Sequence, residues 1–388
     1  MSPIILIPIY LLMTVLTGWM TDVCLREWPF TAGRAARLRK YWITAFALLS
    51  LLPVAGAFLP DSGVKFALQA AGNVWLGFYI YYSGLLLVMF LIAALIRLTT
   101  KRRGFYGGRA VLSAIAALAL VGFGMVHAQD TVVVRYDVNV EKPVEGVDSM
   151  KLALLGDLHL SVNSRLETTR RMVELVNAEQ PDAVVIAGDI FTSSYRGLSN
   201  PEAYAEALRG LNAPVYAVCG NHDVEETLFG GFPISPVSRA FRTREMDRFF
   251  RDCGFNMLYD ETVLLGGCVQ LVGRVDGDKA GDGTANRLDP QDLLSGLDPS
   301  LPIVVLEHEP RQFGPLKEAG ADVALCGHTH AGQIFPGNLI IPFFNENAWG
   351  YAVLRELDTV VTAGVGYYGP PMRVGTDSEV TIVNLHFE

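Results

Sequence analysis

Four long apolar stretches dominate the first third of this 388-residue chain. None of them contains Asp, Glu, Lys or Arg, and each has about the 20 residues that a helix needs to cross a bilayer. They span residues 4–20, 41–59, 73–96 and 110–128. We therefore expect an N-terminal α-helical membrane domain, residues 1–128, with about four transmembrane helices. A cleaved signal peptide is the alternative for the first stretch, but no basic segment precedes it and three more stretches follow.

The basic residues of this domain gather in two of its three connecting loops. The middle loop carries only Asp61 and Lys65. The other two loops hold ten basic residues: Arg26, Arg34, Arg37, Arg39, Lys40, Arg97, Lys101, Arg102, Arg103 and Arg109. Because basic loops remain in the cytoplasm, we expect a multi-pass protein of the cell membrane (inner or plasma membrane), with both termini and the C-terminal domain on the extracytoplasmic side. The alternative is that these loops only improve solubility.

The rest of the chain has the opposite charge balance. Residues 1–128 hold 11 basic and three acidic residues, whereas residues 129–388 hold 20 basic and 37 acidic ones. An acidic surface is a poor electrostatic match for the phosphate backbone of a nucleic acid. We therefore expect no nucleic-acid partner, and a lipid bilayer as the partner of the N-terminal domain.

Residues 150–388 consist of short apolar runs, each followed by a polar loop. KLALLGDLHL, DAVVIAGDI and PVYAVCGNHD read as strands, and helical stretches at 166–178 and 201–209 separate them. This βαβαβ order predicts an α/β domain with parallel strands. Asp157, Asp189 and Asn221 follow these strands at intervals of 32 residues. They should therefore meet at one edge of the sheet, where open α/β sheets bind ligands.

Residues 129–149 read as a linker between the two domains, with a β segment of its own, TVVVRYDVNV.

Histidines concentrate at the ends of the predicted strands. LPIVVLEHEP ends near His308, and ADVALCGHTH ends at His328 and His330, so that five of the seven histidines follow apolar strands. One such histidine alone could be structural, but five of them beside two aspartates and an asparagine indicate a metal site. Carboxylate and amide oxygens mixed with imidazoles suit divalent Mn, Fe or Zn.

These motifs resemble those of the calcineurin-like metallophosphoesterases. The chain has D-x-H at 157–159, G-D at 188–189, G-N-H-D at 220–223, a lone histidine at 308 and G-H-T-H at 327–330. The tail GVGYYGPPMRVGTDSEVTIVNL and the four apolar stretches are similar to the bacterial membrane-associated branch, transmembrane proteins with such a domain. The resemblance covers residues 150–388 and implies a β-sandwich of two mixed sheets flanked by helices, with two divalent metal ions.

The resemblance also implies a role for each motif residue. One ion would be held by Asp157, His159, Asp189 and His330, and the other by Asp189, Asn221, His308 and His328. Asp189 would bridge the ions, which clamp the attacking and leaving oxygens of a phosphoryl transfer. His222 would be the general acid that protonates the leaving oxygen.

The chain departs from the family pattern at Thr192. Many members have a second aspartate there, in G-D-x-x-D, which orients the acid histidine. Either Asp223 or a hydroxyl group takes over this role, or His222 works less well. We count Asp223 with His222 as a predicted catalytic residue. Arg274 follows another strand and could bind a phosphate oxygen, although a surface salt bridge explains it equally well.

Two apolar segments follow metal-site motifs: TLFGGFPI at 227–234 and IFPGNLIIPFF at 334–344. A membrane-facing rim beside the metal site would explain both, whereas core strands would explain the second. Cys253 and Cys268 could pair in an oxidising compartment, which the sequence alone does not decide.

Together these features predict a membrane-anchored, two-metal-dependent phosphohydrolase (phosphodiesterase, pyrophosphatase or phosphatase). We expect it to act outside the cytoplasm on a lipid-linked phosphate substrate. One alternative is a hydrolase of soluble nucleotides or glycerophosphodiesters whose helices only anchor it. Another is a non-catalytic metal-binding sensor or transporter subunit. The sequence does not give the oligomeric state.

Overall fold

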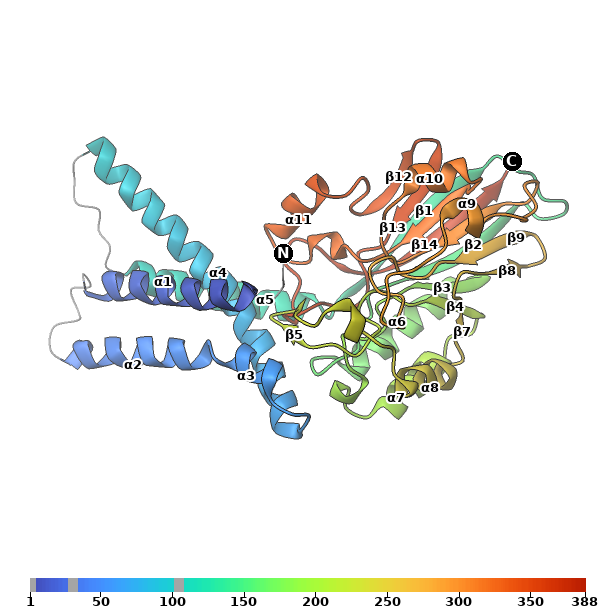
Figure 1. Ribbon diagram of the computed structural model, residues 1–388. Coiled ribbons are helices and arrows are strands. Elements are labelled where there is room, and N and C mark those ends of the chain that lie inside the picture. The colour runs from blue at the N-terminus through green and yellow to red at the C-terminus, as the bar shows by residue number, and fades with distance from the viewer. Residues whose placement is uncertain (1–4, 27–33, 101–107) are drawn as a thin grey trace. The chain divides into compact units, whose positions relative to one another are not determined.

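The computed structural model describes residues 5–26, 34–100 and 108–388 (Figure 1). The chain divides into two compact units. The first, the helical unit, comprises Met1–Val126, Thr227–Ile234 and Gly369–Met372. The second, the sheet unit, comprises His127–Glu226, Ser235–Tyr368 and Arg373–Glu388.

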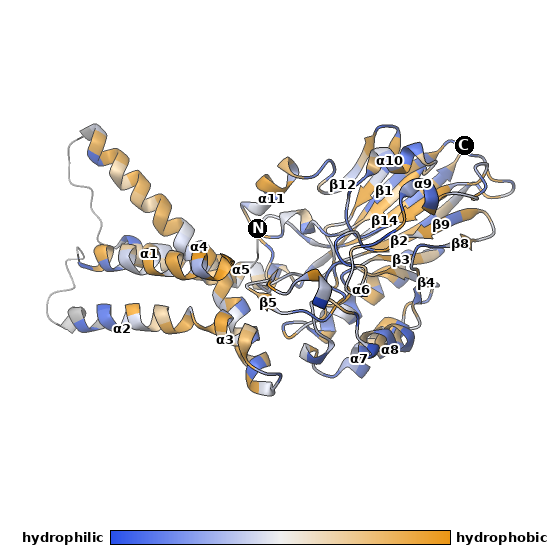
Figure 2. Ribbon diagram, in the orientation of Figure 1, coloured by the Kyte–Doolittle hydropathy of each residue, from blue (hydrophilic) through white to orange (hydrophobic). Residues whose placement is uncertain are grey.

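Long apolar helices form most of the helical unit. They are α1 (Leu6–Arg26), α2 (Arg34–Leu49), α3 (Leu52–Phe58), α4 (Gly63–Thr100) and α5 (Arg109–His127). Among the described residues, four stretches are long and apolar enough to cross a membrane: Leu6–Arg26, Arg39–Phe58, Gly63–Thr99 and Arg109–His127. Figure 2 shows α4 as hydrophobic along most of its length. The prediction of four apolar spanning helices is therefore confirmed.

Two of these spans differ from the sequence expectation. The second is divided into α2 and α3, because Pro53 lies in the first turn of α3 and has no N–H to continue the hydrogen bonds of α2. The third, α4, has 38 residues and is about 57 Å long at 1.5 Å per residue. It exceeds a hydrocarbon layer of about 30 Å, so that a tilt or an extension into the headgroups must accommodate it. Residues 27–33 and the basic Lys101, Arg102 and Arg103 of the predicted loops lie outside the described residues.

Hydroxyl groups join the helices inside this unit. Thr17 of α1 donates to the Ser83 hydroxyl of α4 at 3.1 Å, and the hydroxyls of Thr21 and Tyr82 are 2.7 Å apart. The ring of Phe46 in α2 lies 5.8 Å from that of Tyr82. Such polar pairs contribute about 0.6 kcal/mol each in apolar surroundings, and they align α1 with α4.

Two six-stranded sheets form the sheet unit, with strand orders β1-β14-β2-β3-β4-β7 and β12-β13-β11-β10-β9-β8 (Figure 1). The strands are β1 (Thr131–Val140), β2 (Ser149–Leu155), β3 (Ala183–Ala187), β4 (Val215–Val218), β7 (Asn256–Met257), β8 (Glu261–Leu265), β9 (Val269–Gly273), β10 (Ile303–Leu306), β11 (Val323–Cys326), β12 (Gly350–Leu354), β13 (Leu357–Val361) and β14 (Ser378–Phe387). In the first sheet β2, β3, β4 and β7 run parallel, and β14 is antiparallel to β2. In the second, β9, β10, β11 and β13 run parallel, with antiparallel β8 and β12 at the edges. Both sheets are therefore mixed.

Helices cover the outer faces of the two sheets. Those on the first sheet are α6 (Leu166–Glu179), α7 (Pro201–Arg209) and α8 (Arg244–Cys253), and those on the second are α9 (Pro290–Leu293) and α10 (Phe313–Glu318). Between the sheets, Leu152 and Val185 of the first pack with Leu271, Leu306 and Val360 of the second. The predicted sandwich flanked by helices is confirmed, and β1, the predicted β segment before residue 150, pairs with β14 at its edge.

The two apolar segments that follow metal-site motifs adopt different structures. Residues 227–234 form the hairpin of β5 (Leu228–Phe229) and β6 (Phe232–Pro233), which belongs to the helical unit. Residues 334–344 form α11 (Gly337–Ile340) and a 3₁₀ turn, Ile341–Phe343. The explanation of this second segment by a core strand is wrong. Its two prolines lack the N–H groups that a central strand needs.

Cys253 and Cys268 are both buried free thiols, so they do not form a disulfide with each other.

Candidate metal centre

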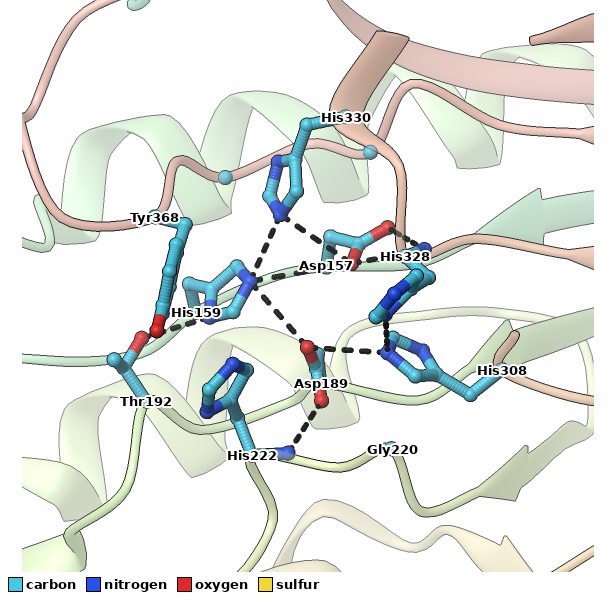
Figure 3. Close-up of polar contacts among 12 residues, drawn as sticks. Asp157, His159, Asp189, Thr192, Gly220, His222, His308, His328, His330 and Tyr368 are labelled. Atoms are coloured by element: carbon cyan, nitrogen blue, oxygen red, sulfur yellow. Dashed lines mark hydrogen bonds and ion pairs between the residues drawn. The ribbon is translucent and has the colours of Figure 1, made fainter. Parts of the chain in front are cut away.

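The predicted ligands converge at one edge of the two sheets (Figure 3). They follow five strands: Asp157 and His159 follow β2, Asp189 follows β3, Asn221 follows β4, His308 follows β10, and His328 and His330 follow β11. His222, the predicted general acid, also follows β4. Five of these residues have left-handed backbone, with φ between 46° and 75°: Asp157, His159, Asp189, His328 and His330. Non-glycine residues rarely adopt this conformation, and each costs about 1–3 kcal/mol. The fold thus holds these side chains inward against local strain.

One group of donor atoms lies around His159 and His330. Their Nε2 atoms are 2.9 Å apart, and Nε2 of His330 lies 3.4 Å from Oδ1 of Asp157. Nε2 of His159 is also 3.6 Å from Oδ2 of Asp189. Asp157, His159 and His330 together could hold one metal ion.

A second group lies around His308. Its Nε2 atom is 3.2 Å from Oδ2 of Asp189, 3.0 Å from Oδ1 of Asn221 and 3.1 Å from Nδ1 of His328. Asp157, Asp189 and His308 could hold a metal ion as well. Oδ2 of Asp189 therefore faces histidines of both groups, while Asp157 also reaches both.

In two of the histidines, the ring nitrogen that points away from the site has a polar partner that orients the ring. Nδ1 of His308 lies 2.8 Å from the carbonyl oxygen of Ala187. Since a carbonyl can only accept, Nδ1 carries a proton, and it is Nε2 that faces into the site, where it offers a lone pair once its own proton is lost. Nδ1 of His159 lies 2.8 Å from the Thr192 hydroxyl, which can donate or accept and so orients the ring without fixing its tautomer. Ring nitrogens that converge in this way, each oriented from behind, are the arrangement of metal-binding histidines, and the donor set fits divalent ions.

Burial and charge set the protonation of the site. Burial lowers the pKa values of His159 and His328 to about 3, so that both imidazoles are neutral and able to bind a metal. Burial raises the pKa of Asp157 to about 7. Burial opposes ionisation of Asp189 and of His308, but their mutual attraction holds the pKa of Asp189 well below and that of His308 well above the usual values. Without metal these two form an ion pair, in which a bound cation would replace the proton of His308.

Arg373 supports the backbone around this site, and this role was not predicted from the sequence. Its buried guanidinium donates to the carbonyl oxygens of Ala363, Gly364 and Gly366 at 2.6–2.9 Å and to that of His330 at 3.3 Å. Burial lowers its pKa to about 10, still high enough for it to carry its charge at neutral pH. The sequence signal was only its place in the tail motif PPMRVG.

The two residues considered as substitutes for the family aspartate have other contacts. The Thr192 hydroxyl contacts His159, as described above, and Asp223 accepts from the backbone N–H groups of Phe191 and Gly220, both at 2.8 Å. Asp223 therefore braces the loops that carry the ligands. Glu226, four residues after His222 and missed at the sequence level, accepts a hydrogen bond from Nδ1 of His222 at 2.9 Å.

Arg274 is buried away from the solvent. Its side chain is only 1% exposed and pairs with Glu307 at 3.0 Å, and it also donates to Gln312 and to the carbonyl oxygen of Leu288. A surface salt bridge was the sequence-based alternative to phosphate binding. Arg274 does form a salt bridge, with Glu307, but it lies in the interior. A phosphate-binding role for Arg274 stays a prediction.

The fold and the donor set define a metal-binding α/β sandwich domain. The family model of the calcineurin-like phosphoesterases matches residues 150–332. This part of the chain is therefore a calcineurin-like phosphoesterase domain, which confirms the resemblance found in the motifs.

Relatives support the same assignment. A transmembrane protein with metallophosphoesterase domain from Danio rerio is 29% identical over 292 residues, 71% of this chain and 62% of the relative. An uncharacterized metallophosphoesterase from Helicobacter pylori is 30% identical over 240 residues, 61% of this chain and 60% of the relative. The chain thus spans about three fifths of the length of these relatives.

Among solved structures, that of a dimetal phosphatase from Danio rerio aligns with 56% of this chain and 88% of its own, at 12% identity and a TM-score of 0.35.

Substitution of Gly220 tests whether the carboxylate of Asp189 organises the metal site. A Cβ atom at Gly220 would collide with the carboxylate and with the backbone nitrogen of Asp189, so the substitution displaces this residue as a whole. We expect Gly220→Ala to weaken Mn²⁺ binding by about 10- to 100-fold without removing any ligand, as measured by calorimetry on the full-length protein. Gly314→Ala is the matched control, because its Cβ would meet only the flexible Arg355 side chain at 3.4 Å. Unchanged affinity in Gly220→Ala would contradict this account.

Substitution of Arg274 separates a structural role from substrate binding. Arg274→Met leaves the buried Glu307 with Arg287, at 3.3 Å, as its remaining cation. We expect the free energy of unfolding to fall by about 3 kcal/mol, measured by chemical denaturation in detergent, with no change in KM for a phosphate ester. A raised KM at unchanged stability would instead assign Arg274 to the substrate.

Proposed function

We propose that this chain is a membrane-anchored, two-metal-dependent phosphohydrolase that acts on a lipid-linked phosphate ester. The observation that carries the proposal is the position of Oδ2 of Asp189, 3.6 Å from Nε2 of His159 and 3.2 Å from Nε2 of His308. A single carboxylate oxygen between two imidazole groups is suited to bridge two cations. The domain would comprise residues 150–388, joined by 129–149 to the membrane domain 1–128.

The proposed ligands divide between two ions. The first set is Asp157, His159, Asp189 and His330, and the second is Asp189, Asn221, His308 and His328. When bound, a pair of Mn, Fe or Zn ions supplies Lewis acidity to the phosphoryl oxygens and an acidified water as nucleophile. The chain's own residues then orient the ester and move the proton of the leaving group.

His222 is proposed as the general acid. Its backbone N–H donates to Oδ1 of Asp189 at 2.8 Å, which places it beside the metal ligands. Its ring lies 4.6 Å from the ring of Tyr368. Asp223 was predicted as a catalytic residue. In this proposal its carboxylate instead binds backbone N–H groups and so holds the 220–223 loop in place.

The lipid-linked substrate is supported by an exposed apolar surface on the sheet unit. Phe335, Leu339, Ile340, Phe343 and Phe344 are 48–86% exposed and follow directly after the GHTH motif. We call these five residues the apolar rim. Five large apolar side chains exposed together mark an interaction site, and a bilayer is the partner that the preceding apolar helices supply.

The connection between the last apolar helix and the first strand is short. Three residues separate the end of α5 at His127 from the start of β1 at Thr131. The basic loops favour the extracytoplasmic side of the cell membrane for this domain.

Hydrolysis of a generic diester tests the enzyme class. We expect the full-length protein in detergent to hydrolyse bis(p-nitrophenyl) phosphate in the presence of Mn²⁺. Asp189→Asn should lower kcat by at least about 100-fold, because the side chain proposed to bridge the two ions loses its negative charge. Asp137→Asn, an exposed aspartate of β1, is the control. A metal-loaded wild-type protein without activity would favour the sensor alternative.

A matched pair of substrates tests the lipid link. Hexadecyl p-nitrophenyl phosphate in vesicles and methyl p-nitrophenyl phosphate in solution share the reacting group and differ in the anchor. We expect Phe343→Ser to lower kcat/KM about tenfold for the hexadecyl ester alone, since burial of a Phe contributes about 1.5–3 kcal/mol. Leu264→Ser, 53% exposed on β8, is the control. A clear preference of the wild type for the methyl ester would support the soluble-substrate alternative.

A further inference from the structure

We propose that Glu226 is the positioning residue of His222 and does for this chain what an aspartate at the Thr192 position does in many family members. The inference rests on the proposed hydrolase function and concerns the step in which the leaving group departs. It assigns a role to a residue that none of the family motifs includes.

The contacts of His222 identify its partner. Nδ1 of His222 lies 2.9 Å from Oε1 of Glu226, whose side chain is fully buried. Since a carboxylate only accepts, Nδ1 donates and the proton to be transferred belongs on Nε2. The Tyr368 ring packs against the imidazole, with ring centroids 4.6 Å apart. The imidazole is therefore held both at its edge and on its face.

The other candidates for this role are engaged elsewhere. The Thr192 hydroxyl contacts Nδ1 of His159 at 2.8 Å, and the two oxygens of Asp223 accept from the backbone of Phe191 and Gly220. Within the described chain, the acidic side chain that hydrogen-bonds the His222 ring is that of Glu226.

Lys279 completes the arrangement. Its ammonium lies 2.6 Å from Oε2 of Glu226 and donates to the carbonyl oxygen of Asn221 at 2.8 Å. The side chain is 92% buried, and its backbone N–H donates to Asp276 at 2.7 Å. Lys279 thus fixes the second oxygen of Glu226 and ties it to the loop that carries a proposed metal ligand.

This geometry has a defined consequence for the reaction. A water-derived oxygen bonds to phosphorus, the bond from phosphorus to the leaving oxygen breaks, and its electron pair stays with that oxygen. The proton on Nε2 of His222 passes to the leaving oxygen, and solvent returns a proton to the imidazole. The Glu226 carboxylate keeps Nε2 directed at the leaving group and stabilises the positive imidazolium before transfer.

Two esters that differ only in the leaving group test this role. Methyl p-nitrophenyl phosphate releases a stable anion that needs little protonation, whereas methyl phenyl phosphate releases a more basic one. We expect Glu226→Gln to lower kcat at least about tenfold more for the phenyl ester than for the p-nitrophenyl ester. Glu226→Asp, which keeps the charge, should retain more phenyl-ester activity. Glu179→Gln, whose glutamate pairs with Arg135 on the surface, is the control.

A double-mutant cycle with His222→Asn separates positioning from a general structural effect. If Glu226 acts through His222, Glu226→Gln should cause no further loss in the His222→Asn protein. Equal losses on both esters, or additive losses in the cycle, would overturn the role of Glu226 and leave the proposed function intact. A metal-loaded wild type inactive on both esters and on hexadecyl p-nitrophenyl phosphate in vesicles would overturn the proposed function and this inference together.

Discussion

The site depends on one buried interaction, the attraction between the Asp189 carboxylate and the imidazoles that face it from two loops. Asp189 follows β3 of the first sheet, while His308 follows β10 of the second. A buried carboxylate or imidazolium is costly unless an opposite charge pairs with it. The ends of β3 and β10 must therefore lie close enough for Asp189 and His308 to meet. A bound pair of cations would satisfy the same requirement, and the remaining ligands are arranged around it.

The supporting residues explain how a strained arrangement persists. Five ligands have left-handed backbone, and strain of this kind survives only where surrounding structure fixes it. Arg373 and Asp223 supply that support by binding backbone groups, and a glycine at 220 leaves room for the carboxylate of Asp189. The same loops carry His222, so the scaffold that holds the ligands also orients the proposed acid.

Much of this was readable from the sequence, because apolar strands followed by polar loops determine which residues meet at a sheet edge. The βαβαβ order and the grouping of the ligands follow from that pattern, and the membrane helices follow from the length of the four uncharged apolar stretches. The roles of Glu226 and Arg373 do not. Glu226 is fixed by Lys279, which lies far away in the chain. Arg373 binds backbone carbonyl groups of the 363–366 loop, and such contacts have no signature in the sequence. The apolar rim was ambiguous because an apolar segment has the same composition whether it is buried or exposed.

Electron paramagnetic resonance of the full-length protein loaded with two equivalents of Mn²⁺ would show directly whether Asp189 bridges two ions. A carboxylate bridge between adjacent ions couples their electron spins. If Asp189 bridges the two ions, the wild type shows an exchange-coupled dinuclear spectrum and Asp189→Asn loses it. Isolated six-line Mn²⁺ signals in the wild type at full loading would contradict it, because the ions would then not share Asp189.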